Sequence, residues 1–217
     1  MHKFKFSGSG WGWLGWSLLY FLATAVIIPA PWAVVALNKW FIRNTTATNG
    51  DKLEFVGTVG QIWYWVVAIS VLTIAELAMG PFGDLLYFLI LLAAYFVFKW
   101  LIDNIRVNNM ALEFVGNKWA WYGRNILVGL SGITIIGWAW VWVWYIKWLC
   151  ENTKSEYGTF TFTGTGGALL WRVLVVGLAS LVIIPIPWMV VWLYRWVADH
   201  ITVTPRPDAQ AMQGVAV

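Results

Sequence analysis

One short pattern occurs four times along this chain and constrains its fold more than any other feature. Each copy reads apolar residue, any residue, phenylalanine, any residue, glycine, and the copies occupy residues 4–8, 53–57, 112–116 and 160–164. Alternation with a period of two predicts a short strand with one apolar face, which ends at the glycine. Because the pattern recurs along the whole chain, the sequence predicts a single domain built from four copies of one structural unit.

A second pattern closes each apolar region and keeps step with the first. It is a basic residue followed by tryptophan, and the four pairs are Lys39-Trp40, Lys99-Trp100, Lys147-Trp148 and Arg195-Trp196. The tryptophans are 60, 48 and 48 residues apart, and Asn44, Asn104, Asn152 or His200 follows each of them by four residues. Two patterns that recur in step indicate four related units, which we place at 3–46, 52–107, 111–154 and 159–204, before a polar tail at 205–217.

Each unit is predicted to contain a strand, two helices separated by a turn, and a returning strand. Proline lacks an N–H group and clashes with the preceding helical turn, so it ends or kinks a helix. We therefore place turns at 29–32, 79–81 and 185–188, and a glycine-containing turn at 136–138 in the third unit. Hairpin turns at 49–50, 108–109 and 157–158 join the units. The expected count is eight short strands and about eight helices.

The composition indicates that these helices lie in a membrane. Hydrophobic residues make up 60% of the chain and charged residues 11%, and there are 19 tryptophans. Charge-free runs cover 11–38, 55–75, 125–146 and 173–194. Each run is at least as long as the roughly 20 apolar residues that span a bilayer core, and tryptophan favours the headgroup level. The expected fold class is a membrane α-helical protein with short β-hairpins.

The basic residues predict one orientation for all four units. All of them except Arg124 and Arg172 lie on the strand side of the helices, whereas the helix–helix turns contain no lysine or arginine. By the positive-inside rule we expect the strands and both termini in the cytoplasm. The second helices of units one, three and four have only about 13–15 residues, or roughly 20–22 Å, which is short of a full span. One kinked helix per unit is the alternative, but short strands need partners and an open strand edge is forbidden in lipid. For the same reason, residues 3–7 are expected to pair with 201–204.

Several of these motif residues resemble those of a known family, the YjgN-like bacterial inner-membrane proteins, whose function is unknown. In unit one the match comprises Phe6, Gly8, Gly10, Pro31, Trp32, Asn44, Thr45, Phe55 and Gly57, and later in the chain Asn152, Thr153, Phe162, Gly164 and Gly166. Unit two departs most, because its second helix is longer and it has no Pro-Trp turn. The resemblance implies a multi-pass protein of the bacterial inner membrane and supplies no chemistry.

Two sets of residues are candidates for a functional site. Arg124 and Arg172 each follow a motif phenylalanine by ten residues, where Trp16 and Trp65 stand in the other units. An arginine within a membrane helix is a functional candidate, although it can also reach back to the interface or cap carbonyl groups.

The second set is the belt of four basic–tryptophan pairs: Lys39, Trp40, Lys99, Trp100, Lys147, Trp148, Arg195 and Trp196. The belt is expected to bind anionic lipid headgroups or an acidic surface of a partner. The alternative is that it only anchors the orientation, helped by acidic residues four positions after three of the cations, Asp103, Glu151 and Asp199. Glu76 and Asp84 are expected at the polar end of a span, with an ion path as the alternative reading.

No sequence motif points to catalysis. We find no phosphate-binding loop, nucleophile elbow, dinucleotide fingerprint or metal-ligand spacing, and there is no basic run that would suggest nucleic-acid binding. We therefore expect a non-enzymatic polytopic membrane protein without metal or cofactor. Its expected role is that of a structural or accessory subunit that contacts lipid, a larger membrane complex or copies of itself. A small-solute or ion transporter or channel is the alternative, and an enzyme that acts on lipid is a third reading.

Overall fold

The computed structural model describes residues 2–134, 136–181 and 184–206, and these confirm the predicted order of elements in every unit. Unit one contains β1 (His2–Phe6), α1 (Gly10–Val26), α2 (Ala30–Arg43) and β2 (Thr45–Ala47). Unit two contains β3 (Leu53–Phe55), α3 (Val59–Met79), the 3-10 helix η1 (Gly80–Leu85), α4 (Leu86–Asp103) and β4 (Ile105–Val107). Unit three contains β5 (Met110–Phe114), α5 (Lys118–Ser131), α6 (Trp138–Glu151) and β6 (Thr153–Ser155). Unit four contains β7 (Gly158–Phe162), α7 (Gly166–Ser180), α8 (Ile186–His200) and β8 (Ile201–Pro205).

The eight strands form one nearly closed antiparallel ring in the order β2-β1-β8-β7-β6-β5-β4-β3. The two strands of each unit pair with each other, and the units are joined through β1–β8, β4–β5 and β6–β7. The predicted pairing of the first and last strands is confirmed, with His2 opposite Val203 and Lys3 opposite Thr202. Between β2 and β3 a single bridge, Thr46 to Lys52, closes the remaining gap. Ring closure leaves few strand edges exposed.

Each first helix begins immediately after the glycine of its strand because a polar residue caps it. Ser9, Asn117 and Thr165 accept hydrogen bonds from backbone N–H groups of the first helical turn. In unit two, Thr58 forms a reciprocal capping box with Gln61. These side chains satisfy amide groups that have no partner within the helix, so the strand-to-helix transition is fixed by local sequence.

Three of the charge-free runs each contain parts of two helices, as the predicted turns require. Turns divide three of the runs, so that 11–38 is shared by α1 and α2, 125–146 by α5 and α6, and 173–194 by α7 and α8. Helices α2, α5 and α6 have 14 residues each, or about 21 Å at 1.5 Å per residue. Two helical segments of the described residues, Val59–Met79 and Phe82–Asp103, are long and apolar enough to cross a membrane.

The turns lie close to their predicted positions. They differ from the prediction in the start of the second helices of units one and four and in the connection within unit two. In units one and four, α2 and α8 begin directly after Pro29 and Pro185, as proline in the first helical turn allows. In unit two, η1 replaces a simple turn and carries the chain from α3 into α4. Unit four extends to Pro205, one residue beyond its predicted end, and residues 207–217 of the predicted tail lie outside the described part of the chain.

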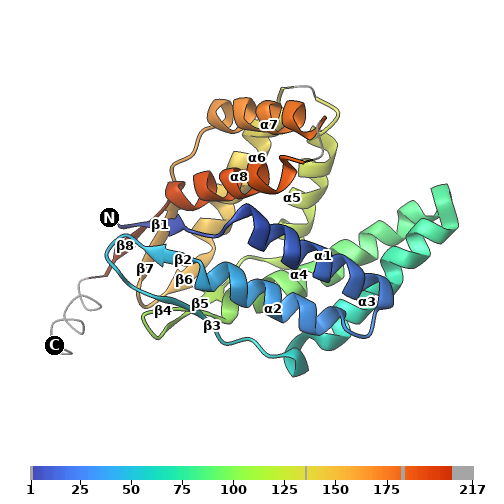
Figure 1. Cartoon of the computed structure of the whole chain (residues 1–217), viewed down its shortest axis with the longest axis horizontal. Coiled ribbons are helices and arrows are strands. Elements are labelled where there is room, and N and C mark those ends of the chain that lie inside the picture. Colours follow the sequence, from blue (N-terminus) through green and yellow to red (C-terminus); the bar gives the residue numbers. More distant parts are fainter. Residues whose placement is uncertain (1, 135, 182–183, 207–217) are drawn as a thin grey trace.

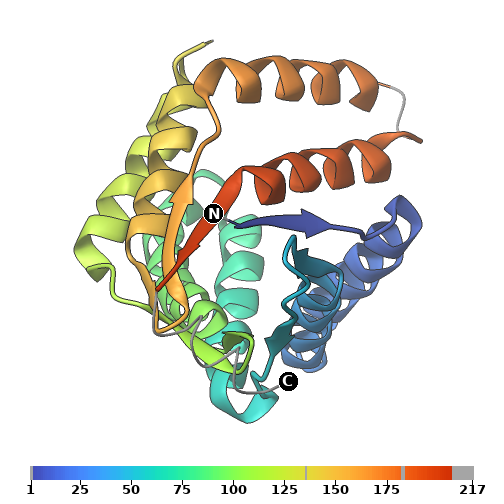
Figure 2. The same ribbon diagram turned by 90° about the vertical axis from the view of Figure 1, so that its left-hand side faces the viewer.

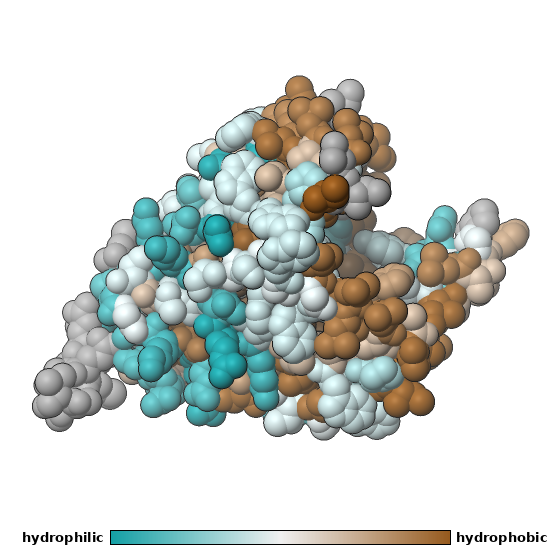
Figure 3. Space-filling view, in the orientation of Figure 1, coloured by the Kyte–Doolittle hydropathy of each residue, from teal (hydrophilic) through white to brown (hydrophobic). Residues whose placement is uncertain are grey.

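The helices surround a common axis, and the strands lie together at one end. Each helix packs against the next along the chain, and α8 packs against α1, so the helices also close on themselves. All strands lie on the left in Figure 1, and Figure 2 looks onto this strand end, with the units following one another around the molecule. Hydrophilic side chains gather over the strands, and hydrophobic ones over the helices farther away (Figure 3).

Candidate functional site

The tryptophan of each basic–tryptophan pair packs against the strand of its own unit. Its ring meets the motif phenylalanine nearly edge to face, with centroid separations of 5.7, 5.3, 5.8 and 5.9 Å for Phe6–Trp40, Phe55–Trp100, Phe114–Trp148 and Phe162–Trp196. Such edge-to-face contacts are favourable for aromatic rings. Trp100 and Trp196 are only 9% and 4% exposed. These rings therefore fasten the second helix of a unit to its first strand, a role that the sequence did not predict.

The motif glycine makes room for this contact. A Cβ atom at Gly164 would lie 2.5 Å from the ring of Phe162 and 3.0 Å from that of Trp196, and Gly8, Gly57 and Gly116 are equally crowded. The residue four positions beyond the tryptophan completes the cluster. Asn44, Asn104 and Asn152 donate a side-chain hydrogen bond to the tryptophan carbonyl at 2.7–2.8 Å. The recurrent residues are thus explained by one structural cluster per unit.

The four cations of the predicted belt have different surroundings. Lys99 Nζ donates to the carbonyl oxygen of Phe114 at 2.7 Å, and Arg195 Nη2 donates to that of Gly8 at 2.9 Å. Lys99 therefore ties its unit to the first strand of the next unit around the ring, and Arg195 ties its unit to the segment that follows β1. Lys39 and Lys147 are exposed, and neither makes a hydrogen bond or ion pair within the described residues. Only these last two leave their full charge available to a ligand.

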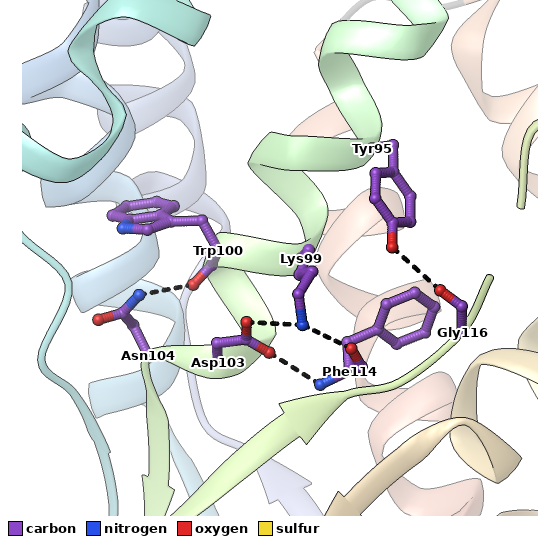
Figure 4. Close-up of polar contacts among 7 residues, drawn as sticks. All are labelled: Tyr95, Lys99, Trp100, Asp103, Asn104, Phe114 and Gly116. Atoms are coloured by element: carbon purple, nitrogen blue, oxygen red, sulfur yellow. Dashed lines mark hydrogen bonds and ion pairs between the residues drawn. The ribbon is translucent and has the colours of Figure 1, made fainter. Parts of the chain in front are cut away.

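The junction between α4 and β5 shows how one cation is held (Figure 4). Lys99 Nζ lies 3.0 Å from Asp103 Oδ2, and Asp103 Oδ1 accepts the amide hydrogen of Phe114 at 2.8 Å. Tyr95 donates to the carbonyl oxygen of Gly116 at 3.0 Å. Lys99–Asp103 is the one ion pair in the described part of the chain, so the predicted pairs Lys147–Glu151 and Arg195–Asp199 do not form. Both acids are exposed, where an ion pair contributes little.

Arg124 and Arg172 lie at the same place in units three and four, each against two tryptophans of the following helix. The Arg124 guanidinium is 4.8 Å from the ring of Trp144 and 4.3 Å from that of Trp148. Arg172 is 5.4 Å from Trp192 and 5.0 Å from Trp196. These distances are within the range of cation–π attraction.

Each arginine also reaches back one helical turn toward the strand end. Their Nη1 atoms donate to the carbonyl oxygens of Ala120 and Ala168, at 3.2 and 2.8 Å. No carboxylate of a described residue lies within salt-bridge distance of either side chain. In unit two the corresponding pair is Trp65 stacked on Phe96, with centroids 4.3 Å apart. Arginine and tryptophan thus occupy equivalent packing positions, which favours the structural reading of both arginines.

An apolar cavity of about 540 Å³ lies between the strands and the second helices of the four units. Phe4, Leu112 and Phe160 of the strands and Phe98 and Ile146 of the helices contribute to its wall. None of the described residues that line it carries a charge. Glu76 and Asp84 lie away from it, at the end of α3 and in η1, so the structure does not place them on an axial ion path.

A hydrogen-bonded bridge joins two opposite hairpins of the strand ring. Tyr157, between β6 and β7, is fully buried and donates to Asp51 Oδ2 at 2.5 Å. Asn49 donates to the Tyr157 hydroxyl at 3.2 Å and to Asp51 at 2.6 Å. Burial, together with the hydrogen bond to Asp51, raises the pKa of Tyr157 to about 12. The sequence suggested Tyr157 only as a turn residue, because its partners are distant along the chain.

The described residues contain no group of three His, Cys, Asp or Glu side chains that could hold a metal ion. No protein-family model, curated protein or solved structure matches the chain.

Proposed function

We propose that this chain is a non-enzymatic, multi-pass protein of the bacterial inner membrane, with the strand ring on the cytoplasmic side. The observation that carries the proposal is the exposure of its apolar helices. Segments Val59–Met79 and Phe82–Asp103 have mean hydropathies of 1.8 and 2.3, yet only 17% and 22% of their most apolar windows are buried. Soluble monomers rarely leave such large apolar surfaces uncovered, and a bilayer would cover them.

The most exposed apolar side chains lie at the ends of the helices farthest from the strands. Leu77, Phe82, Ile133 and Leu181 are 78–81% exposed, and these positions belong to three different units. The basic residues lie at the opposite end, and the helix–helix turns contain none in the sequence. This polarity supports an orientation with the strands at the cytoplasmic headgroups and the turns in or beyond the apolar layer.

The unequal helix lengths support an asymmetric insertion. The pair α3–α4 is long enough to cross a bilayer core of roughly 30 Å. The pairs of units one, three and four consist of helices of 14–17 residues, which extend about 21–26 Å. They would require local thinning of the bilayer. The resemblance to the YjgN-like proteins also supports a location in the bacterial inner membrane.

The proposed role is structural or accessory, through contacts with lipid or with a larger membrane complex. Two features support such contacts. Lys39 and Lys147 are exposed at the strand end, and large apolar side chains are exposed at the opposite ends of the helices. The transporter alternative is supported by the central cavity alone. Its wall offers only a few polar groups, Thr45, Thr153, Cys150 and Tyr194 among them, and this composition suits an apolar occupant better than an ion.

Membrane fractionation and cysteine labelling test the proposal. In a Cys150→Ala background, single cysteines at positions 49 and 108 should both react only from the cytoplasmic side, and the protein should stay in the membrane after alkaline extraction. Release by alkali would overturn the membrane assignment, and labelling from opposite sides would overturn the helix-hairpin topology. Purification in mild detergent then reveals whether the chain comes out with lipid alone or with a partner complex.

A further inference from the structure

A second cavity, of about 690 Å³, lies where unit one meets unit two. Helices α1 and α2 and strands β2 and β3 contribute its wall, which includes Trp16, Ala36, Lys39, Arg43 and Lys52. It lies beside the part of the ring that is joined by the single bridge from Thr46 to Lys52. We call it the seam pocket. Two departures of unit one from the fourfold repeat explain why it exists and what it can bind.

The first departure leaves the pocket open. In units two, three and four, an aromatic residue of the second helix (Phe96, Trp144 or Trp192) covers the residue ten positions after the motif phenylalanine. Unit one has Ala36 at this place, opposite Trp16. The methyl group cannot fill the volume of an aromatic ring, so the half-buried apolar side chains of Trp16 and Ala36 line one side of the pocket.

The second departure makes the pocket basic. The residue four positions after the belt cation is Asp103, Glu151 or Asp199 in the other units, whereas unit one has Arg43. Arg43 lines the pocket together with Lys39 and Lys52, and all three are exposed. No carboxylate of the described residues lies within salt-bridge distance of any of them. The acid in the wall, Glu54, stands opposite Arg106 in the β3–β4 register.

We propose that the seam pocket binds the headgroup of one anionic phospholipid. Lys39, Arg43 and Lys52 would hold the phosphate, because a guanidinium and two ammonium groups are strong donors to phosphate oxygens. The hydrophobic part of the lipid would lie along Trp16 and Ala36. This proposal rests on the membrane location proposed above and assigns the lipid contact to one of the four unit junctions.

An amphiphile fits the pocket better than a free anion does. Lys39 and Arg43 lie at the end of α2, and Lys52 directly precedes β3, at the strand end of the molecule. Trp16 and Ala36 lie about one to two helical turns deeper along α1 and α2. The wall therefore changes from basic to apolar in the direction in which a lipid enters a bilayer. Inorganic phosphate would use only the basic part.

Native mass spectrometry of the detergent-solubilised protein tests the proposal with phosphatidylglycerol and phosphatidylcholine of the same chain length. We expect one phosphatidylglycerol to bind in preference to phosphatidylcholine. Lys39→Gln should weaken it about fivefold, and Arg43→Asp, which changes the charge by two, about 25-fold. Ala36→Phe, which restores the aromatic residue of the other units, should also reduce binding. Lys147→Gln is the matched control, because it removes the equivalent exposed cation of unit three.

Each result decides the proposal. Equal affinity of the parent, Lys39→Gln and Arg43→Asp proteins, or equal loss in Lys147→Gln, would overturn it. Displacement of the lipid by inorganic phosphate at comparable concentrations would reassign the pocket to a soluble anion. Arg43→Gln replaces Arg43→Asp if the latter does not elute as a folded species in gel filtration. Alkaline extraction of the parent protein distinguishes failure of the proposed membrane location from failure of the proposed lipid site. If the protein stays in the membrane but does not prefer phosphatidylglycerol, only the lipid site in the seam pocket is refuted.

Discussion

Replacing Tyr157 with phenylalanine would remove one hydroxyl group from the bridge between two opposite hairpins of the strand ring. The aromatic ring, which is fully buried, would keep its packing. The 2.5 Å hydrogen bond to Asp51 and the 3.2 Å contact with Asn49 would be lost. Hydrogen bonds to a charged group contribute about 1.5–3 kcal/mol. Since Asn49 still donates to Asp51 at 2.6 Å, we expect a loss near the lower end, about 1.5 kcal/mol.

The same bridge gives the stability a pH dependence with a definite sign. An unfolded tyrosine ionises near pH 10, whereas in the folded protein the pKa of Tyr157 is raised to about 12. Below pH 10 both states keep the proton, and the bridge contributes fully. As the pH rises from 10 through 12, the unfolded state releases its proton first, so the contribution of the bridge is lost.

Thermal unfolding in detergent, followed by tryptophan fluorescence between pH 7 and pH 11.5, measures both effects. Tyr157→Phe should melt at a lower temperature than the parent at pH 7, and the difference should shrink above pH 10. Tyr20→Phe, at a tyrosine that is 37% exposed, is the control and should match the parent. Equal melting temperatures of Tyr157→Phe and the parent at pH 7, or a difference that stays constant up to pH 11.5, would refute this reasoning.

Three further predictions concern the packing of the units. Gly164→Ala places a Cβ atom 2.5 Å from Phe162 and should lower the free energy of unfolding by about 1–3 kcal/mol. The control Gly167→Ala, with nothing within 4 Å of its Cβ atom, should raise it by up to about 1 kcal/mol. Equal melting temperatures of the two variants would contradict the proposed clusters. Deletion of residues 2–7 removes buried Phe4 and Phe6 and opens two strand edges, so the protein should lose its single gel-filtration peak; a truncated form as stable as the parent would disprove ring closure. Arg124→Trp mimics the unit-two stack of Trp65 on Phe96 and should keep the free energy of unfolding within about 1 kcal/mol of the parent's. Loss of lipid or partner binding at unchanged stability would instead assign Arg124 a functional role.

The local elements of this protein could be predicted from its sequence because their causes are local. Short alternating segments followed by glycine formed strands, and the turns predicted at 29–32 and 185–188 lie next to the observed breaks, although α2 and α8 already begin after Pro29 and Pro185. The Asn108-Asn109 turn joins β4 and β5 with positive φ angles of 52° and 67°, as asparagine tolerates in hairpins. The pairing of β1 with β8 also followed, because these were the two strands without a covalent partner.

The roles of the recurrent residues could not be predicted in the same way. A tryptophan at the end of an apolar helix has the same sequence pattern whether it faces lipid or packs on a strand. Only the folded unit brings Trp196 onto Phe162 and Gly164. The lengths of the second helices, by contrast, could be predicted from the turns, since the expected 13–15 residues agree with the 14, 14 and 15 residues of α2, α6 and α8.

The seam pocket depends on tertiary structure throughout. Trp16 lies in α1, Ala36 and Arg43 lie in α2, and Lys52 directly precedes β3, and nothing in their local sequence shows that they share one cavity. The sequence by itself predicted four units of one strand–helix–helix–strand order, and the structure has this order in each of them. The nearly closed ring decided which positions face one another across a junction, and so where a single exchange, Arg43 in place of an acid, concentrates charge. Contacts between residues far apart in the chain arise from packing, which local periodicity does not encode.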